Sequence, residues 1–357
     1  MVDALVVRLA REELVYLLRA LSIPAIATLE PGALITLEGE QLALALSVAD
    51  RTLRARGMVR WGGAEQRNPD PVIVGLLRAL GNPGYTLILD VRRTAEAAQP
   101  GGQPGQGSNQ PIAQRLVYTF ASYTAVEHTQ PEPGVHQFVA LATAQDAFLR
   151  LLQLIEVADT DEDTAQNGAT TSEQGQAPGR PIAQGEISLN VLGEMNRLLA
   201  TGNAAGAQKA LASHISATLA QGLIGALTAP RSFSQFGLWP GLPFTISPPT
   251  GETSGASGMG SLVPQPPAAT LIVAQAQNGD IYTLTQGEAN TTKNPTNKPN
   301  GRNGTARAQV TVAQVTADQA RAAMANILNP ALAVVKPGQQ ANTGDANAGS
   351  TGNAGPA

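Results

Sequence analysis

The chain has 357 residues and a mass of 36.8 kDa, enough for two modest domains or one large one. It contains no cysteine, which excludes disulfides, thiolate metal sites and cysteine nucleophiles. The formal net charge of −4 excludes an overall basic surface for nucleic acid, and with 43% hydrophobic but only 4% aromatic residues the core must be mainly aliphatic.

The N-terminal segment carries acids and arginines among its apolar residues, unlike a signal peptide. No apolar run approaches the ~18 residues of a membrane span. The lack of cysteine also fits a reducing compartment. We therefore expect a cytoplasmic protein without membrane insertion.

The first half of the chain is patterned for helices followed by strands. The arginines before Gly57 are typical of a helix end, and Asp70 before Pro71 is a suitable N-cap. Thr143 and Asp146 have the spacing of a capping pair. These signals and the apolar periodicity predict helices over 8–22, 37–57, 70–81 and 144–157, and strands at 85–93, 115–123 and 135–142.

The second half has a similar pattern. Thr316 and Gln319 form a second capping pair, and Asn278-Gly279 marks a tight hairpin turn. We predict helices over 186–201, 204–228 and 317–328, and strands at 269–275, 280–286 and 307–315. Five segments rich in Gly, Pro, Gln, Asn, Ser and Thr lack the apolar residues needed to offset ordering entropy: 94–113, 158–184, 246–267, 287–306 and 336–357.

Short blocks recur in the same order in the two halves. TLIL at 86–89 matches TLIV at 270–273, and VYTF at 117–120 matches IYTL at 281–284. LLRALGNP matches LIGALTAP, and VALATAQD matches VAQVTADQ. We interpret these matches as an internal duplication. The alternative is that generic strand–turn–helix sequence arose twice.

The duplication predicts an α+β fold of two quasi-symmetric repeats that share one central antiparallel sheet of six strands. Each repeat would contain helices, a three-stranded meander and a closing helix. The insertion 94–113 would occupy the hairpin tip equivalent to Asn278-Gly279, because loop tips accept insertions at small cost. The predicted units are an N-terminal half 1–157, a disordered linker 158–184, a C-terminal half 185–330 with flexible insertions 246–267 and 287–306, and a disordered tail 331–357.

Motifs for catalysis are missing from the sequence: it has no phosphate loop, dinucleotide-binding glycine pattern or nucleophile elbow. The acidic run 159–163 has Thr164 and Thr170 where a calcium loop needs Gly and Glu. His128 and His136 could face each other across a turn, but a third metal ligand is lacking, so we interpret them as surface residues at strand ends. We predict no enzyme activity, metal or cofactor; the alternative is an enzyme whose site is assembled from scattered residues.

Residues 51–93 are locally basic, with eight arginines against three acids. The order of a helix, the Gly57 turn, the helix 70–81 and a strand pair also resembles a winged helix. The alternative function is therefore a DNA-binding regulator that uses residues 37–93. Because PVIVGLLRAL offers one arginine and no Asn or Gln to read bases, we predict no nucleic-acid partner.

Aromatic residues, rare in this chain, cluster in FSQFGLWPGLPF at 233–244, which we place in an insertion of the second repeat. An exposed anchor for a partner is one interpretation. We favour the other, in which the cluster plugs one end of the core.

Three segments of the first half carry a family resemblance: RLAREELVYLLRALS at 8–22, VADRTLRARGMV at 48–59 and DPVIVGLLRALGNPGYTLILDV at 70–91. RLVYTF, VHQFVAL and the helix from Ala144 follow in order. Together they resemble the EspG family, the dedicated cytosolic chaperones of type VII secretion. The resemblance covers most of 8–157 and, more weakly, 186–328. The chain departs from the family in its longer low-complexity linkers and its Ala-rich second half.

The resemblance implies two quasi-symmetric halves around an antiparallel sheet. It also implies an ATP-independent chaperone that covers the apolar helical tip of a secreted protein, PE/PPE-like or WXG100-like, which would otherwise aggregate. The sequence predicts no oligomeric state. Our candidates for partner binding, near the predicted hairpins and the aromatic cluster, are Arg92, Arg93, Tyr118, Phe120 and Trp239.

Overall fold

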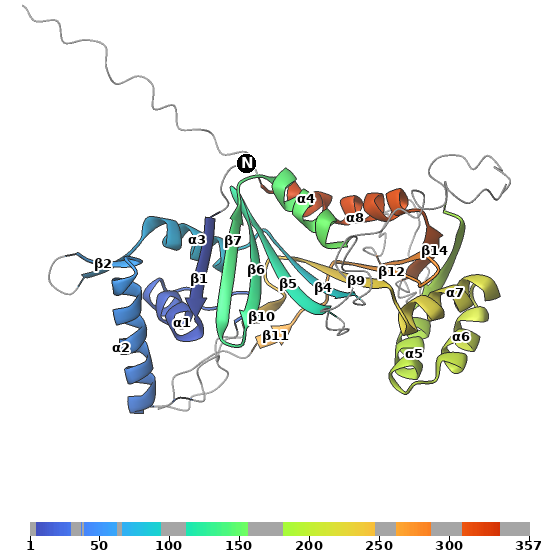
Figure 1. Ribbon diagram of the computed structural model, residues 1–357, viewed down its shortest axis with the longest axis horizontal. Helices are drawn as coiled ribbons and strands as arrows, with labels where there is room; N and C mark the ends of the chain where they lie inside the picture. Colours follow the sequence, from blue (N-terminus) through green and yellow to red (C-terminus); the bar gives the residue numbers. More distant parts are fainter. Residues whose placement is uncertain are drawn as a thin grey trace, which may run out of the picture.

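The computed structural model describes residues 5–29, 37, 39–62, 66–93, 112–155, 181–246, 262–286 and 309–335. A ten-stranded antiparallel sheet runs through the molecule, with helices on both of its faces (Figure 1). The protein is therefore α+β, as predicted.

The strand order in this sheet is β1-β7-β6-β5-β4-β9-β12-β13-β14-β8. The first half of the chain contributes β1 (Leu5–Ala10), β4 (Tyr85–Arg93), β5 (Ile112–Ala121), β6 (Thr124–Glu132) and β7 (Val135–Leu141). The second half contributes β8 (Ala183–Ser188), β9 (Ser232–Pro240), β12 (Ala269–Gln275), β13 (Ile281–Gln286) and β14 (Gln309–Val315).

The two halves meet at β4 and β9, which pair from Tyr85 opposite Pro240 to Arg93 opposite Ser232. Outward from this seam, both halves have the same succession of strands, and each ends with its own first strand, β1 or β8, at an edge. The expectation of three strands in each half was wrong, because each half supplies five. A common origin of the two halves stays a prediction.

The strand order also changes which segments correspond. β4 takes the place in its half that β9 takes in the other, so TLIL in β4 and TLIV in β12 are not equivalent. β5 corresponds to β12 and β6 to β13. The segment between β4 and β5 therefore corresponds to the one between β9 and β12, and its proposed match with Asn278-Gly279 was wrong.

One face of the sheet is covered by α4 (Ala144–Ile155) and α8 (Ala317–Leu332), which contact each other above the seam (Figure 1). Their buried side chains, including Leu151, Met324 and Leu328, pack on alternate residues of the central strands. These two helices and the sheet enclose the core that spans both halves.

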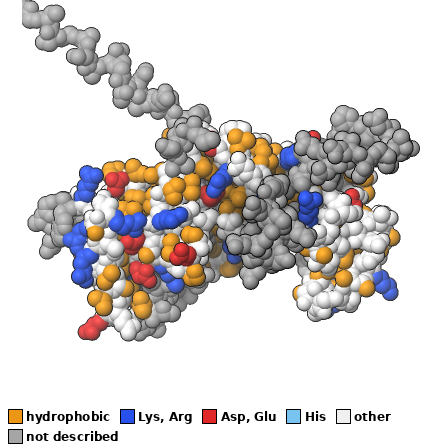
Figure 2. Space-filling view, in the orientation of Figure 1, with side chains coloured by type: hydrophobic (Ala, Val, Ile, Leu, Met, Phe, Trp, Pro, Cys, Tyr) orange, Lys and Arg blue, Asp and Glu red, His pale blue; other side chains and the backbone are white. Residues whose placement is uncertain are grey.

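The opposite face carries two separate helix bundles, one at each end of the sheet (Figure 1). Figure 2 shows more charged side chains over the first bundle than over the second. The first bundle consists of α1 (Arg11–Ala20), α2 (Gly39–Ala55) and α3 (Pro71–Gly81). The second consists of α5 (Leu189–Ala200), α6 (Ala204–Ala212) and α7 (Ala217–Thr228).

Helix caps follow the sequence signals closely. The backbone N–H of Val72 donates to Asp70 Oδ1 at 2.9 Å at the beginning of α3. Thr143 and Asp146 each accept a backbone N–H from the other at the start of α4. Thr316 and Gln319 form the same reciprocal pair before α8. These local motifs satisfy donors that a helix N-terminus would leave unpaired.

Four strands of the large sheet were not predicted from the sequence: the edge strands β1 and β8 and the internal strands β6 and β9. Residues 8–10 belong to β1 and residues 186–188 to β8, although both ranges continue into the helical patterns that follow. The predicted helix 204–228 is two helices, because Ser216 caps α7 at Leu219 after a break. The aromatic segment is not an insertion: Phe236 lies in β9 and is buried at the centre of the sheet.

Most of the low-complexity residues lie outside the described residues, including all of 287–306 and 336–357. Residues 112–113 and 183–184 begin strands, and Leu262–Pro264 forms β11, which pairs with β10 (Phe244–Ile246). The predicted tail from 331 is also partly ordered, since Ala331 and Val335 are buried in the main core.

The winged-helix interpretation was wrong. The strands expected to form the wing, β4 and β5, lie in the middle of the large sheet. α3 directs Ile73, Leu77 and Leu80 into the core of the first bundle. A small hairpin, β2 (Val59–Gly62) and β3 (Gln66–Pro69), separates α2 from α3 instead.

Among the described residues, no helix is both long enough and apolar enough to traverse a lipid bilayer.

Candidate functional site

The central strands have one face in the core and one face turned toward the space between the two bundles. In β4, Leu87 and Leu89 are fully buried beneath α4 and α8. In β9, Phe236 and Leu238 are buried in the same core, on the same face of the sheet. Because side chains alternate along a strand, the other face carries Ile88, Asp90 and Arg92 from β4 and Phe233, Gln235, Gly237 and Trp239 from β9.

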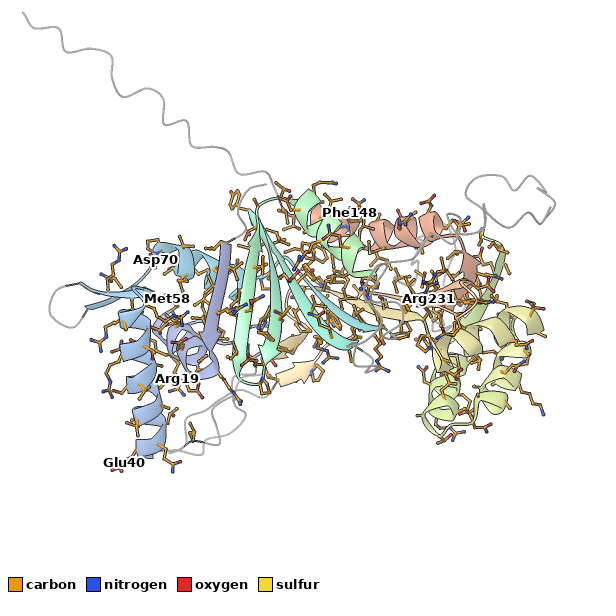
Figure 3. All side chains as sticks on the ribbon, in the orientation of Figure 1. Arg19, Glu40, Met58, Asp70, Phe148 and Arg231 are labelled. Atoms are coloured by element: carbon orange, nitrogen blue, oxygen red, sulfur yellow. The ribbon has the colours of Figure 1, made fainter. Side chains whose placement is uncertain are left out.

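A cavity of about 630 Å³ lies on this second face, between the seam of the sheet and the α5–α7 bundle. We call it the central groove. Its floor comes from β4, β9 and β12, and its wall from α5 and the end of α7. Arg231, labelled in Figure 3, lies where α7 gives way to β9. The groove lining includes Arg92, Phe233, Gln235, Ile272, Asn196 and Leu199.

The groove is lined by both apolar and polar side chains, and Arg92 is the exposed cation among them. The guanidinium carbon of Arg92 lies 5.7 Å from the centroid of the Phe233 ring, because the two residues are paired across the seam. A cation over an aromatic face is attracted by the ring quadrupole. No acidic residue lines the cavity among the described residues.

The nearest acid on the same strand face is Asp90, and it is engaged elsewhere. Arg115 of β5 donates to both of its carboxylate oxygens, from Nε at 2.7 Å and from Nη2 at 2.9 Å. This bidentate hydrogen bonding raises the pKa of Arg115. The Asp90 charge is therefore balanced on the side away from the groove.

Arg93, the last residue of β4, reaches toward α4. Its Nη2 donates to the backbone carbonyl of Leu154, and more weakly to that of Gln153 at 3.4 Å. These carbonyls belong to the last turn of the helix, which favours a cation. Arg93 borders the groove, but its guanidinium binds the end of α4.

Tyr118 and Phe120 do not belong to any surface: both side chains have 0% exposure in the core beneath α4. The Tyr118 hydroxyl donates to Glu127 Oε2 at 2.5 Å, and Arg150 donates to the same carboxylate at 3.0 Å. Burial and the Glu127 charge raise the pKa of Tyr118, so its hydroxyl stays protonated. The prediction that these two residues bind a partner was wrong, because the even-numbered side chains of β5 point into the core beneath α4.

Trp239 is half-buried at the other end of the seam. It lies opposite Thr86, six residues along β4 from Arg92 and hence roughly 20 Å away. Its ring covers Gly237, where an added Cβ would come within 2.4 Å of the ring, and its Nε1 donates to the Gln265 carbonyl at 2.8 Å. Trp239 therefore shares the exposed sheet face with Arg92 but does not line the central groove.

His128 and His136 do face each other, with 2.9 Å between Nε2 of His128 and Nδ1 of His136. They are buried rather than at the surface, with 2% and 1% exposure. Thr28 Oγ1 contacts Nδ1 of His128 at 2.5 Å, and the ring of Phe138 stacks on His128. Burial lowers the pKa of both histidines, that of His128 to about 3, so both are neutral near pH 7.

No group of three or more metal-ligating side chains lies close together in the described part of the chain. The acidic run 159–163 lies outside that part. Besides each other, the two histidine rings have the Thr28 hydroxyl and the Gln130 side-chain amide within hydrogen-bonding distance in the described part of the chain. What the central groove offers is a mixed surface, with apolar side chains such as Phe233, Ile272 and Leu199 beside one exposed cation, Arg92.

The sequence interpretation missed the part of the groove that comes from the second bundle. Asn196 and Leu199 were assigned to a helix without a role, and Ile272 to an ordinary hairpin. The alternation in SFSQFGLWP separates Phe233 and Gln235 from Phe236, and it was the available signal for a strand with two different faces.

No family model matches this sequence, and no match was found among curated proteins. Among solved structures, the chain is similar to the type VII secretion system chaperone EspG5 of Mycobacterium tuberculosis, determined in complex with a PE25–PPE41 dimer. The TM-score is 0.49 at 12% sequence identity, over 91% of this chain and 96% of that chain.

Proposed function

We propose that this protein is an ATP-independent chaperone or adaptor that binds the apolar helical tip of a type VII secretion substrate and keeps it soluble. The observation that carries the proposal is the central groove, an open cavity between the sheet seam and the α5–α7 bundle that exposes the apolar side chains Phe233, Ile272 and Leu199. The resemblance of 8–22, 48–59 and 70–91 to the EspG family supports the substrate class.

The groove suits a helix better than a small rigid ligand. Its floor is a strand seam and its wall is the side of α5, so both are elongated surfaces. A helix of about 10 Å diameter can lie along such a surface and insert side chains spaced three and four residues apart. Phe233, Ile272 and Leu199 supply the apolar contacts, and covering them would also protect this chain from association.

The proposed partners are small helical secreted proteins, either a PE/PPE-like pair or a WXG100-like dimer. Such proteins expose an apolar tip before export, and a holding chaperone needs no nucleotide because binding alone covers the patch. The chaperone would act in the cytoplasm, before the secretion machinery takes the substrate.

The test is co-expression of the full chain with a tagged PE/PPE pair or a tagged WXG100 dimer from the same genome, followed by affinity purification. Asn196→Trp places a large ring in the groove from an exposed position on α5. Asn190→Trp is the matched control, because Asn190 is exposed on the same helix outside the groove lining. We expect the first variant, and not the second, to lose a client that the wild type retains.

Two results would contradict the proposal. One is that no client of either class co-purifies with the wild-type chain. The other is that Asn196→Trp retains the client as fully as Asn190→Trp does, which would move binding away from the groove.

A further inference from the structure

We infer that the central groove selects a helix carrying a carboxylate, which binds Arg92. This inference rests on the proposed function and specifies the chemistry of the partner. It follows from the charges around one exposed side chain.

Arg92 is the cation that the groove presents. Its side chain is exposed, and it forms no ion pair with any residue in the described ranges. The neighbouring arginine, Arg93, donates to carbonyls at the end of α4 instead. A partner therefore meets the Arg92 guanidinium on a floor whose other described side chains, including Phe233, Gln235 and Ile272, carry no charge.

The fold removes the acid that would otherwise neutralise this guanidinium. Asp90 lies two residues before Arg92 on the same strand face, but both of its oxygens accept hydrogen bonds from Arg115. Asp90 and Arg115 are cross-strand partners in the register of β4 and β5, whereas Arg92 is paired with Ala113. The register thus assigns the acid to one arginine and leaves the other for a ligand.

Phe233 orients the free guanidinium. With the guanidinium carbon 5.7 Å from the ring centroid, the aromatic face holds the Arg92 side chain over the floor of the groove. A planar guanidinium binds a carboxylate through two parallel hydrogen bonds, and an apolar surround strengthens them. Nucleic acid would need several cations along its backbone, whereas Arg92 and Arg93 are the basic residues that line the groove in the described ranges, and Arg93 binds the end of α4. The favoured ligand is an Asp or Glu with apolar residues three or four positions away on a helix.

The experiment uses two fluorescein-labelled 18-residue helical peptides with the same leucine-rich face, one with Glu and one with Gln between the leucines. Fluorescence anisotropy measures their binding to the full chain. We expect the Glu peptide to bind about tenfold more tightly, because a charge-assisted, bidentate hydrogen bond to the guanidinium is stronger than the neutral one that Gln can accept. This preference should disappear in Arg92→Gln and persist in Arg78→Gln, which removes an exposed arginine from α3.

Arg115→Gln gives a second, independent readout. Arg115 does not line the groove, but its loss frees the Asp90 carboxylate beside Arg92. The preference for the Glu peptide should therefore weaken in this variant, whereas the Gln peptide should bind as before. A merely structural role of the ion pair would change both peptides alike.

The outcomes separate this inference from the proposed function. Equal affinity for the two peptides, with loss of both in Asn196→Trp, would overturn the carboxylate inference and leave the groove as a helix site. Binding of neither peptide to the wild type would overturn both the inference and the assignment of the groove to helices.

Discussion

The buried histidine pair predicts that the protein loses stability in mild acid. His128 and His136 lie in the core between β6, β7 and the segment that contains Thr28, and neither ring is exposed by more than 2%. Burial lowers both pKa values, so folding excludes a proton that the unfolded chain would take up below pH 6.5.

The size of the effect follows from the His128 pKa of about 3. Because the folded-state pKa is depressed, the unfolded state binds more protons between pH 6.5 and pH 3, and stability falls as the pH falls through that window. Each pH unit below 6.5 costs about 1.4 kcal/mol, so the loss between pH 7 and pH 5 is about 2 kcal/mol from His128 alone.

The assay is urea unfolding of the full chain at several pH values from 7.5 to 5, followed by circular dichroism. His128→Gln removes the titrating ring but keeps hydrogen-bonding groups for Thr28 and His136. We expect the variant to be less stable than wild type at pH 7 and to lose about 2 kcal/mol less between pH 7 and pH 5. Equal pH dependence in the two proteins would refute the reasoning.

Two further predictions concern packing. Gly222→Ala should destabilise the protein by about 1–3 kcal/mol in urea unfolding, because the added Cβ would come within 2.0 Å of the Tyr282 hydroxyl. Gly225→Ala on the same helix is the control: its Cβ would meet nothing within 4 Å, and the change should stabilise α7 by up to about 1 kcal/mol. Equal effects of the two substitutions would contradict the close approach of α7 to β13. Glu127→Gln should cost about 1–3 kcal/mol by the same measurement, because the buried carboxylate accepts from both Tyr118 and Arg150, and an unchanged midpoint would show that this cluster adds nothing.

The sequence identified many features that depend on neighbours along the chain. The Thr316–Gln319 pair caps α8, and Gly279 takes a φ of 91° in the turn between β12 and β13. A capping side chain binds an N–H only three residues away, and a glycine without Cβ can take a positive φ by itself. Both features therefore depend only on residues within one turn of the chain. This explains why most helices begin where the sequence places them.

The edge strands β1 and β8 could not be predicted from the sequence, because their alternation of buried and exposed residues is short and each strand runs directly into a helix. In β1 only Val7 and Leu9 are buried, and the same leucine also fits the helical stripe of the following segment. Two buried residues are too few to distinguish a period of 2 from a period of 3.6. The same ambiguity concealed β8.

The candidate site was predictable only in part. Arg92 was nominated and lies in the groove, but Tyr118 and Phe120 were nominated from the same hairpin and are buried. The face that a strand turns to the core depends on what packs there, and for β5 that is decided by α4, which comes later in the chain. Leu199 and Asn196 joined the site only because α5 lies beside the seam.

The sequence by itself determined the helix caps, the turn at Asn278-Gly279 and the mainly aliphatic core. The tertiary structure alone decided that β4 pairs with β9, which face of each strand is covered, and that Asp90 binds Arg115 while Arg92 faces the groove. The physical reason is distance along the chain. Local signals involve residues three or four apart, whereas Arg92 and Phe233 lie 141 positions apart in the sequence (233 − 92) and meet only because β4 pairs with β9.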